Sequence, residues 1–246
     1  MNPSSFFNDQ GYYLAKGLLP ALVCTELREA FLKEIKTYQG ELLRQRNVCY
    51  EKHRIASSGF MNNPLLDVHN ANYDTFEAFN TAIQRIFDQP PLFNLVRQIL
   101  NATPILIQSM YFESSRGTQV HYDHSFIKIQ GEDAHAASMI GIWIALEPIA
   151  ESAGKFYVYP KSHRIGTSAC SDEGNRLFDK YLNVSTQGID RGDQKEISYV
   201  VTGDKILKAL IAQEKWDKVS PDMEIGDVLF FSGQILHGSD NPVHFL

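Results

Sequence analysis

The chain is poor in cysteine and has no long apolar run. Its three cysteines (Cys24, Cys49 and Cys170) are odd in number and in no metal-type spacing, so we interpret them as reduced thiols. The first residues lack the basic start and apolar stretch of a signal peptide, and no segment could span a bilayer. These absences argue against a disulfide-stapled secreted domain and against a membrane protein, and we expect a cytoplasmic location.

Charge of either sign is also modest. The formal net charge is −6 at pH 7, and charged residues make up 21% of the chain. So mild a balance gives no reason to expect nucleic acid or membrane as a partner. The 43% of hydrophobic and 11% of aromatic residues can build a sizeable core. We therefore expect a globular protein that acts on a small molecule, as a monomer or homodimer.

The first hundred residues have mostly helical patterns. Apolar residues at near-helical spacing predict a helix over residues 21–38. The sequence of residues 74–77 resembles a capping box and predicts a helix that runs from there to about Asp88. Pro90 and Pro91 interrupt this helix, and residues 92–100 predict another short helix.

After Pro104 the sequence changes to short segments rich in β-branched and aromatic residues. Predicted strands cover residues 105–112, 118–129, 138–146, 155–159 and 227–231. Such a series is typical of a sandwich or barrel rather than of alternating strands and helices. The polar segment 167–221, with one predicted helix at 204–213, we interpret as an insertion or lid. No linker divides the chain, so we expect one domain over residues 1–246.

One short segment carries metal-binding chemistry. His121 and Asp123 lie two residues apart in a predicted strand. Because successive side chains on a strand alternate faces, both would point the same way, with Tyr122 turned away. His237 follows the apolar stretch 226–231 and a tight turn. Two histidines and one carboxylate suit non-haem Fe(II), since three adjacent coordination positions then stay free.

The same residues are open to other interpretations. A histidine and an aspartate two positions apart arise by chance in many chains, and on a surface they are usually only solvated. A cupin-type lyase or isomerase would hold Mn or Ni, but cupins usually supply a His-x-His pair, which this chain lacks. The third alternative is a catalytically silent β-barrel that binds a small molecule or a protein partner.

Several further motifs follow the first one in a fixed order. With these blocks the sequence resembles the phytanoyl-CoA dioxygenase-like family of Fe(II)/2-oxoglutarate oxygenases, over roughly residues 104–241. The blocks are His121-Tyr122-Asp123, Trp143 to Glu147, Ser152-Ala153-Gly154, Pro160 to Arg164, and His237-Gly238-Ser239. In the family the fourth block mostly shapes a turn beside the barrel, so we interpret His163 and Arg164 as structural.

The resemblance implies a mainly β fold with helices (α+β). Its core would be a double-stranded β-helix (a cupin-like jelly roll) over about residues 104–246, supported by helices of about residues 1–103. It also implies roles for individual residues. His121, Asp123 and His237 would be the iron ligands, Trp143 would lie along the 2-oxoglutarate pocket, and Ser239 would hydrogen-bond the far carboxylate of that co-substrate. Met110 would line the same pocket, with ordinary core packing as the alternative.

The activity implied is that of a dioxygenase. It would use 2-oxoglutarate and O2 to hydroxylate an unactivated C–H bond of a small organic molecule, forming succinate and CO2. Related halogenases carry glycine or alanine in place of Asp123, so the carboxylate favours hydroxylation. The aromatic residues near the motifs suit an apolar or amphipathic substrate, although core packing explains them equally well. They are Tyr111, Phe112, Tyr122, Phe126 and Tyr157.

One feature departs from the family pattern. Members usually hold the far carboxylate of 2-oxoglutarate with an arginine one strand beyond the distal His-Gly-Ser, because a guanidinium binds a carboxylate with two parallel hydrogen bonds. The sequence ends at Leu246, before or just where that arginine would fall. Either the sequence is truncated, or Arg116, Arg164 or Lys128 substitutes for the arginine, or co-substrate binding is altered.

Overall fold

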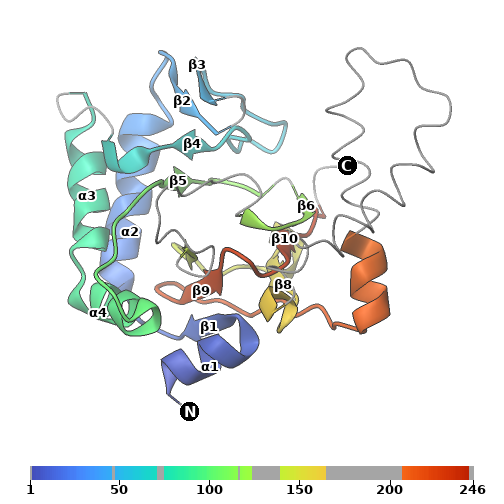
Figure 1. The fold of residues 1–246 in the computed structure, drawn as a ribbon. Helices are drawn as coiled ribbons and strands as arrows, with labels where there is room; N and C mark the ends of the chain where they lie inside the picture. Colours follow the sequence, from blue (N-terminus) through green and yellow to red (C-terminus); the bar gives the residue numbers. More distant parts are fainter. Residues whose placement is uncertain are drawn as a thin grey trace, which may run out of the picture.

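The structure is a computed structural model that describes residues 2–45, 48–70, 75–115, 117–123, 139–164 and 207–243 (Figure 1). The described helices are α1 (Pro3–Gln10), α2 (Ala21–Ala30), the π-helical η1 (Phe31–Ile35), α3 (Glu77–Phe87), α4 (Pro90–Leu100), residues 207–214, and the short 3-10 turns η3 (Val68–Asn70), η6 (Glu151–Ala153) and η7 (Ser162–Arg164). None of the described helices is long and apolar enough to cross a bilayer.

The strands form three antiparallel sheets. They are β1 (Tyr12–Ala15), β2 (Leu42–Arg44), β3 (Cys49–Glu51), β4 (Leu65–Leu66), β5 (Met110–Tyr111), β6 (Thr118–His121), β7 (Ile140–Ile144), β8 (Phe156–Val158), β9 (Val228–Ser232) and β10 (His237–Ser239). The sheet orders are β1-β9-β7, β6-β10-β8 and β3-β2-β4-β5. Helices α2, α3 and α4 lie together on one side of the molecule (Figure 1). The α+β class predicted from the sequence is therefore confirmed.

Strand β9 shows why the core has two layers. All five of its residues are buried. The four apolar ones, Val228 to Phe231, point alternately to opposite faces of the strand. Val228 and Phe230 pack into the large cluster formed with the helices. Leu229 and Phe231 point the other way and pack with Phe156 of the second sheet. Because both faces of β9 are covered, its sequence is an unbroken apolar run and shows no polar alternation.

The helices reach the third sheet through aromatic contacts. The predicted helix 21–38 is present as α2 followed by η1. Phe31, at the start of η1, is 0% exposed and stacks on Tyr111 of β5 with ring centroids 4.3 Å apart. Phe79 of α3 packs edge-on against the same tyrosine at 5.8 Å. These rings fix β5 against the helical layer.

The start of α3 differs from the prediction. Asp74 of the expected capping box lies outside the described residues, and the N-cap residue Phe76 has no side-chain cap. The carboxylate of Glu34, from η1, accepts hydrogen bonds from the backbone N–H groups of Ala78 (3.2 Å) and Phe79 (2.9 Å). A negative group there satisfies free N–H donors and faces the positive end of the helix dipole. This cap is a tertiary contact, which a local pattern could not reveal.

Two predicted strands are shorter than expected. Of residues 105–112 only Met110–Tyr111 pair as β5, and Ile105 is 83% exposed. Strand β6 ends at His121, and residues 124–138 lie outside the described part of the chain. The other three predicted strands contain β7, β8 and most of β9. The helix at 207–214 matches the one predicted at 204–213, whereas residues 165–206 are not described, so the lid interpretation remains a prediction.

Two of the three cysteines lie among the described residues, and neither is in a disulfide there. Cys24 is buried in the helical core and Cys49 is partly exposed. This agrees with the interpretation of reduced cysteines for these two. Cys170 lies outside the described residues.

A buried carboxylate ties β9 to the loop after β1. Asp227 accepts hydrogen bonds from Lys16 Nζ (2.6 Å), from the N–H of Gly17 (2.7 Å) and from the N–H of Glu224 (2.7 Å). Burial by itself would raise the pKa of Asp227, but the lysine and the backbone donors outweigh it and hold the pKa below its ordinary value.

We expect Asp227→Asn to lower the free energy of unfolding by about 1.5–3 kcal/mol at pH 7, the usual cost of a hydrogen bond to a charged group. A lowered folded-state pKa stabilises the protein above the ordinary value of 3.8, and this stabilisation is lost as the pH falls below it. Urea unfolding at several pH values measures the difference, which should shrink in acid. Asp222→Asn, at a carboxylate whose side chain is 86% exposed, should have a much smaller effect.

Candidate metal centre

The structure brings His121, Asp123 and His237 together. Strands β6 and β10 are antiparallel neighbours (Figure 1), and their register places His237 directly opposite His121. Asp123 Oδ1 lies 3.5 Å from His121 Nε2 and 3.4 Å from His237 Nε2. One ligand atom from each residue lies within 4.8 Å of the others. Asp123 stands just past the end of β6 rather than inside the strand, yet its side chain turns to the same side as His121.

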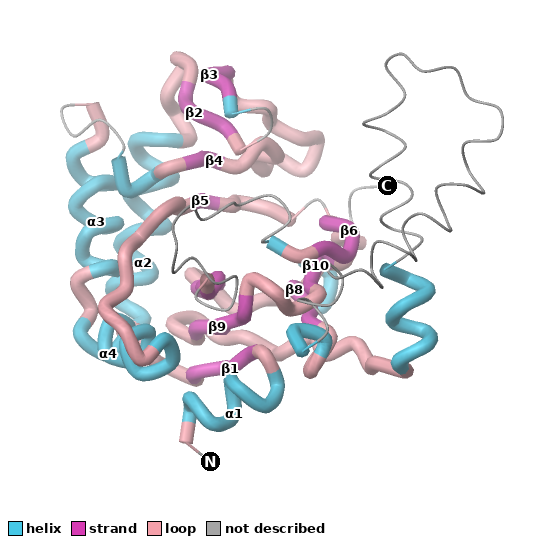
Figure 2. Tube along the Cα trace, viewed as in Figure 1, coloured by secondary structure: helices cyan, strands magenta, loops and turns pink. Residues whose placement is uncertain are grey.

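The opposite side of these two strands is apolar. Val120, Tyr122 and Leu236 are buried there, and side chains of the segment 207–216 pack against them. Tyr122 is thus turned away from His121 and Asp123, as the alternation predicted. Figure 2 shows the helix at 207–214 on the side of the molecule opposite α2, α3 and α4. This helix therefore supports the metal-facing strands from behind.

Backbone carbonyls orient both imidazole rings. His121 Nδ1 lies 2.8 Å from the carbonyl oxygen of Gln119, and His237 Nδ1 lies 2.9 Å from that of Ile235. A carbonyl can only accept, so Nδ1 of each ring is the donor in these hydrogen bonds. In each ring Nε2 is then the nitrogen that faces Asp123. This is the arrangement by which a protein prepares histidines for a metal.

Asp123 supplies the negative charge of the cluster. Burial by itself would raise its pKa, but the interactions with His121 and His237 outweigh burial and hold the pKa well below the ordinary value. Asp123 is therefore a carboxylate at neutral pH. Two imidazole nitrogens and one carboxylate oxygen fit a divalent transition metal. His237 is 3% exposed, whereas His121 and Asp123 are partly exposed.

An aromatic wall covers the inner side of His237. The ring of Phe156 stacks on it at 5.4 Å, and the ring of Phe231 lies at 4.7 Å. Gly141 of β7 stands opposite Phe231 in the register, and a Cβ at Gly141 would collide with the Phe231 ring. The glycine thus leaves room for the ring that packs on His237. The sequence motifs did not single out either phenylalanine.

Trp143 extends this wall. It stacks on Phe156 with ring centroids 5.2 Å apart and contacts Phe112 at 5.3 Å. The tryptophan is therefore separated from His237 by a single ring. Met110, expected beside it, lies on β5 paired with Leu66 and is 39% exposed. Met110 is too exposed to be an ordinary core residue, and its place in the 2-oxoglutarate pocket remains a prediction.

Ser239 lies on the same strand as His237, two residues further along and in regular register with β8. Both side chains therefore point to the same face of the sheet. The hydroxyl of Ser239 accepts a hydrogen bond of 3.1 Å from the hydroxyl of Ser115. The structure thus places a hydroxyl group on the metal-facing side of β10.

Of the five aromatic residues noted near the motifs, one joins this wall. Phe112 contacts Trp143, whereas Tyr111 stacks in the helical core. Tyr122 lies on the outer face, and Tyr157 contacts Tyr159 and Lys218. Phe126 lies outside the described residues. Core packing therefore explains Tyr111.

The three basic residues considered as partners of the far carboxylate divide into two groups. Arg116 and Lys128 lie outside the described residues. Arg164 pairs with the carboxylate of Asp9 and also donates to its backbone oxygen. His163 Nε2 lies 3.1 Å from the carbonyl oxygen of Asn8. Both residues thus hold the C-terminal end of α1, in agreement with the structural interpretation, and Arg164 is engaged away from the metal cluster.

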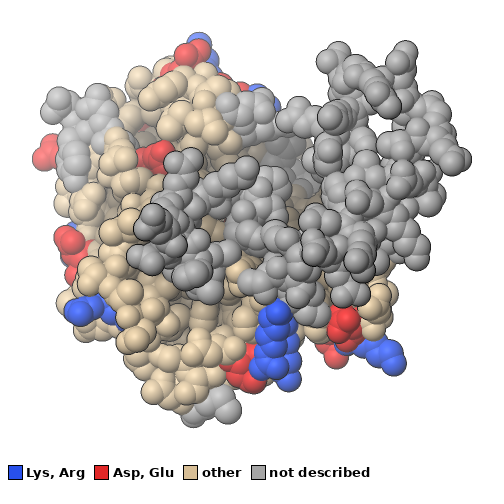
Figure 3. Space-filling view, in the orientation of Figure 1, with Lys and Arg blue, Asp and Glu red and all other residues tan. Residues whose placement is uncertain are grey.

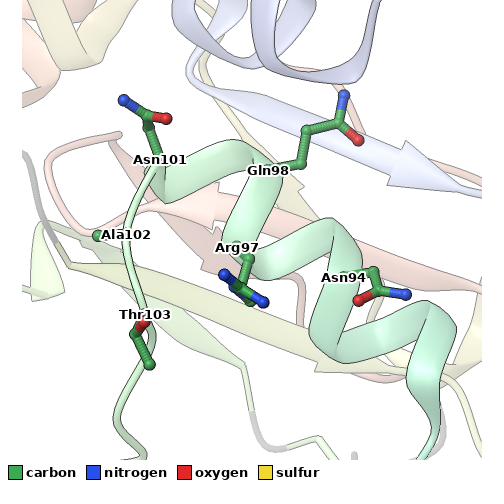
Figure 4. A pocket seen from close by; sticks show the side chains of 6 residues that line it. All are labelled: Asn94, Arg97, Gln98, Asn101, Ala102 and Thr103. Carbon is green, nitrogen blue, oxygen red and sulfur yellow. The ribbon is translucent and has the colours of Figure 1, made fainter.

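A separate hollow of about 430 Å³ lies along the C-terminal half of α4 (Figure 4). Its lining residues are Asn94, Arg97, Gln98, Asn101, Ala102 and Thr103. All of them are exposed, and none is a histidine, cysteine or carboxylate.

On the face shown in Figure 3, the described acidic and basic side chains stand mainly at the margins, in groups of mixed sign. The metal-type cluster is therefore the stronger candidate for chemistry.

Known proteins share both the sequence pattern and the fold. Residues 7–241 match the family described as Phytanoyl-CoA dioxygenase (PhyH). "Phytanoyl-CoA dioxygenase domain-containing protein 1" of Danio rerio is 23% identical over 190 residues, which are 65% of this chain and 64% of that relative. The chain therefore matches less than two thirds of that relative's length.

Two solved structures resemble the whole chain. EctD from S. alaskensis, with 2-oxoglutarate and 5-hydroxyectoine, has a TM-score of 0.62 at 15% identity, covering 99% of this chain and 71% of that one. The non-heme alpha ketoglutarate dependent carbocyclase SnoK from nogalamycin biosynthesis has a TM-score of 0.61 at 14% identity, with 99% and 78% covered. At these identities the likeness shows the fold, and it confirms the predicted jelly-roll architecture. Since the family match extends over residues 7–241, the chain belongs to the phytanoyl-CoA dioxygenase (PhyH) family.

Proposed function

We propose that this protein is an Fe(II)- and 2-oxoglutarate-dependent dioxygenase. It would hydroxylate an unactivated C–H bond of a small organic molecule with O2, releasing succinate and CO2. The observation that carries the proposal is the convergence of His121, Asp123 and His237, with both Nε2 atoms within 3.5 Å of the carboxylate. Family membership and the 2-oxoglutarate-binding structural neighbours support the same class of reaction.

The three residues would hold the iron through His121 Nε2, His237 Nε2 and the Asp123 carboxylate. Three ligands on one side of a metal leave adjacent positions for a chelating co-substrate and for dioxygen. The bound iron would supply the oxidising chemistry, as metals do in such enzymes. Asp123 offsets part of the metal's charge. The carbonyl oxygens of Gln119 and Ile235 fix the ring orientations.

The neighbouring side chains would bind and orient 2-oxoglutarate. Ser239 stands two residues from His237, about 7 Å along the strand, so it lies within reach of the far end of a five-carbon diacid anchored at the metal. Trp143 and Phe156 would form an apolar side of that pocket. Their packed rings exclude water from the inner side of His237, which strengthens electrostatic interactions there.

Hydroxylation is the outcome that we propose. The carboxylate of Asp123 would take the metal position that related halogenases leave vacant. The fold also supports other outcomes, because its neighbours include the epimerase SnoN and the carbocyclase SnoK. EctD with bound 5-hydroxyectoine carries a hydroxylated compound in the same fold. The substrate itself we describe only as a small organic molecule.

Metal removal tests the proposed class of reaction. Purified protein treated with a chelator should form no succinate from 2-oxoglutarate, and Fe(II) with ascorbate in air should restore succinate formation. Zn(II) should occupy the same ligands without restoring it, because zinc has no redox chemistry. Succinate formation that survives iron removal, or that proceeds without O2, would contradict the proposal. Bound iron without any succinate formation, across a panel of small substrates, would favour the silent binding protein.

A further inference from the structure

A chain of hydrogen bonds leads to Ser239. The N–H of Gly117 donates to Ser115 Oγ at 3.2 Å, and Ser115 Oγ donates to Ser239 Oγ at 3.1 Å. Ser115 stands in the connection between β5 and β6, and Ser239 stands on β10. The two hydroxyl groups therefore join segments that are 124 residues apart in the sequence.

The chain of hydrogen bonds runs from the Gly117 N–H through Ser115 Oγ to Ser239 Oγ. The hydrogen bond from Gly117 polarises the Ser115 hydroxyl group and strengthens it as a donor. Ser239 Oγ accepts the hydrogen bond from Ser115, and its own O–H can then donate to a further acceptor. A hydroxyl group that accepts a hydrogen bond is a better donor in turn. The relay therefore delivers a directed O–H donor on the metal-facing side of β10.

We propose that Ser115 is a positioning residue for the co-substrate. It orients and polarises the Ser239 hydroxyl toward the far carboxylate of 2-oxoglutarate. This inference rests on the function proposed above and adds a residue that the sequence motifs did not mark. A donor that is aimed in advance binds an anion with little reorganisation. Of the candidate bases for this carboxylate, the described one, Arg164, pairs with Asp9 instead.

The neighbours of Ser115 hold it in place. Glu113 accepts a hydrogen bond of 2.6 Å from the N–H of Met61 and pairs with Lys36. Ser114 Oγ donates to the carbonyl oxygen of Met61 at 3.0 Å. Gly117 adopts a left-handed backbone (φ 73°), and a Cβ there would collide with the side chain of Asn241. These contacts hold Glu113, Ser114 and Gly117 in place, which limits the reorganisation that binding of an anion requires.

The test is an anaerobic titration of the Fe(II)-loaded protein with 2-oxoglutarate, following the visible band of the iron chelate. We expect Ser115→Ala to weaken 2-oxoglutarate binding by about 5- to 10-fold, the usual value of one ordinary hydrogen bond, because Ser115 acts on the carboxylate only through Ser239. Ser115→Thr, which keeps the hydroxyl, should restore most of the affinity. Ser114→Ala is the matched control, because its hydroxyl bonds to Met61 and not to Ser239.

A second ligand separates positioning from a general structural role. 2-Oxopentanoate has the same chelating end and chain length but no far carboxylate, so Ser115→Ala should leave its affinity unchanged. Ser115→Ala added to Ser239→Ala should cost nothing further. Equal losses for both ligands, or an unchanged affinity for 2-oxoglutarate, would overturn the inference while leaving the proposed function intact. Absence of the chelate band in the unmodified protein would instead overturn the proposed function.

Discussion

Replacing Asp123 with alanine should reduce iron-dependent turnover of 2-oxoglutarate by at least about 100-fold. Loss of groups that only orient metal ligands costs 10- to 100-fold in affinity or activity, so loss of a direct ligand should cost no less. Asp123 is also the one carboxylate of the cluster, and its Oδ1 lies within 3.5 Å of both Nε2 atoms. Without it, only the two imidazole ligands of the cluster would remain to hold a dication.

The measurement is succinate formation with Fe(II), ascorbate and 2-oxoglutarate, together with the metal content of the purified variant. Asp88→Ala, at an exposed carboxylate just after α3, is the matched control and should keep wild-type activity. A well-folded Asp123→Ala protein that retained wild-type turnover would refute the assignment of Asp123 as an iron ligand. A protein that lost turnover but kept its thermal unfolding temperature would support it.

Replacing Phe31 with alanine should lower the free energy of unfolding by about 3–5 kcal/mol, the usual cost of removing a buried phenylalanine. The ring is 0% exposed, stacks on Tyr111 and contacts Phe79, so its loss would leave a cavity among the helices and β5. The neighbouring backbone could not close such a cavity, because three elements meet there. A loss of this size is a large part of the stability of an ordinary domain.

Leu32→Ala offers a control at the next residue, since Leu32 is 40% exposed and lies in the same η1 turn. It should cost less than about 1 kcal/mol, as substitutions near the surface usually do. Urea unfolding of the two variants beside the wild type measures both values. Similar losses at both positions would show that η1 contributes through its backbone and not through the packing of the Phe31 ring.

The residues of the metal cluster could be predicted because strand geometry is simple. The two-residue period of a strand predicts His121 and Asp123 on one side and Tyr122 on the other. The structure has the side chains in this arrangement, although β6 ends at His121 and Asp123 lies past its end. His237 could be predicted from its place after an apolar strand. The order of blocks along the chain then indicated the family and, through it, the fold.

Other parts of the site depend on contacts that no local pattern contains. Phe156 reaches His237 from the neighbouring strand β8 of the same sheet, and Phe231 reaches it through the packing of two sheets. Ser115 meets Ser239 because β6 pairs with β10. The cap of α3 comes from Glu34 of η1, which is also a tertiary contact, although the sequence around Asp74 predicted a local capping box. A sequence motif shows which residues have the right chemistry, and tertiary packing decides which neighbours assist them.

The central claim is that His121, Asp123 and His237 hold an iron ion, to which 2-oxoglutarate binds as a chelating ligand. Its most direct test is the absorption spectrum of the protein, loaded anaerobically with one equivalent of Fe(II) and then titrated with 2-oxoglutarate. The account predicts a weak visible charge-transfer band that saturates at one 2-oxoglutarate per chain and is absent in Asp123→Ala. A folded, iron-loaded wild-type protein that shows no such band would contradict it.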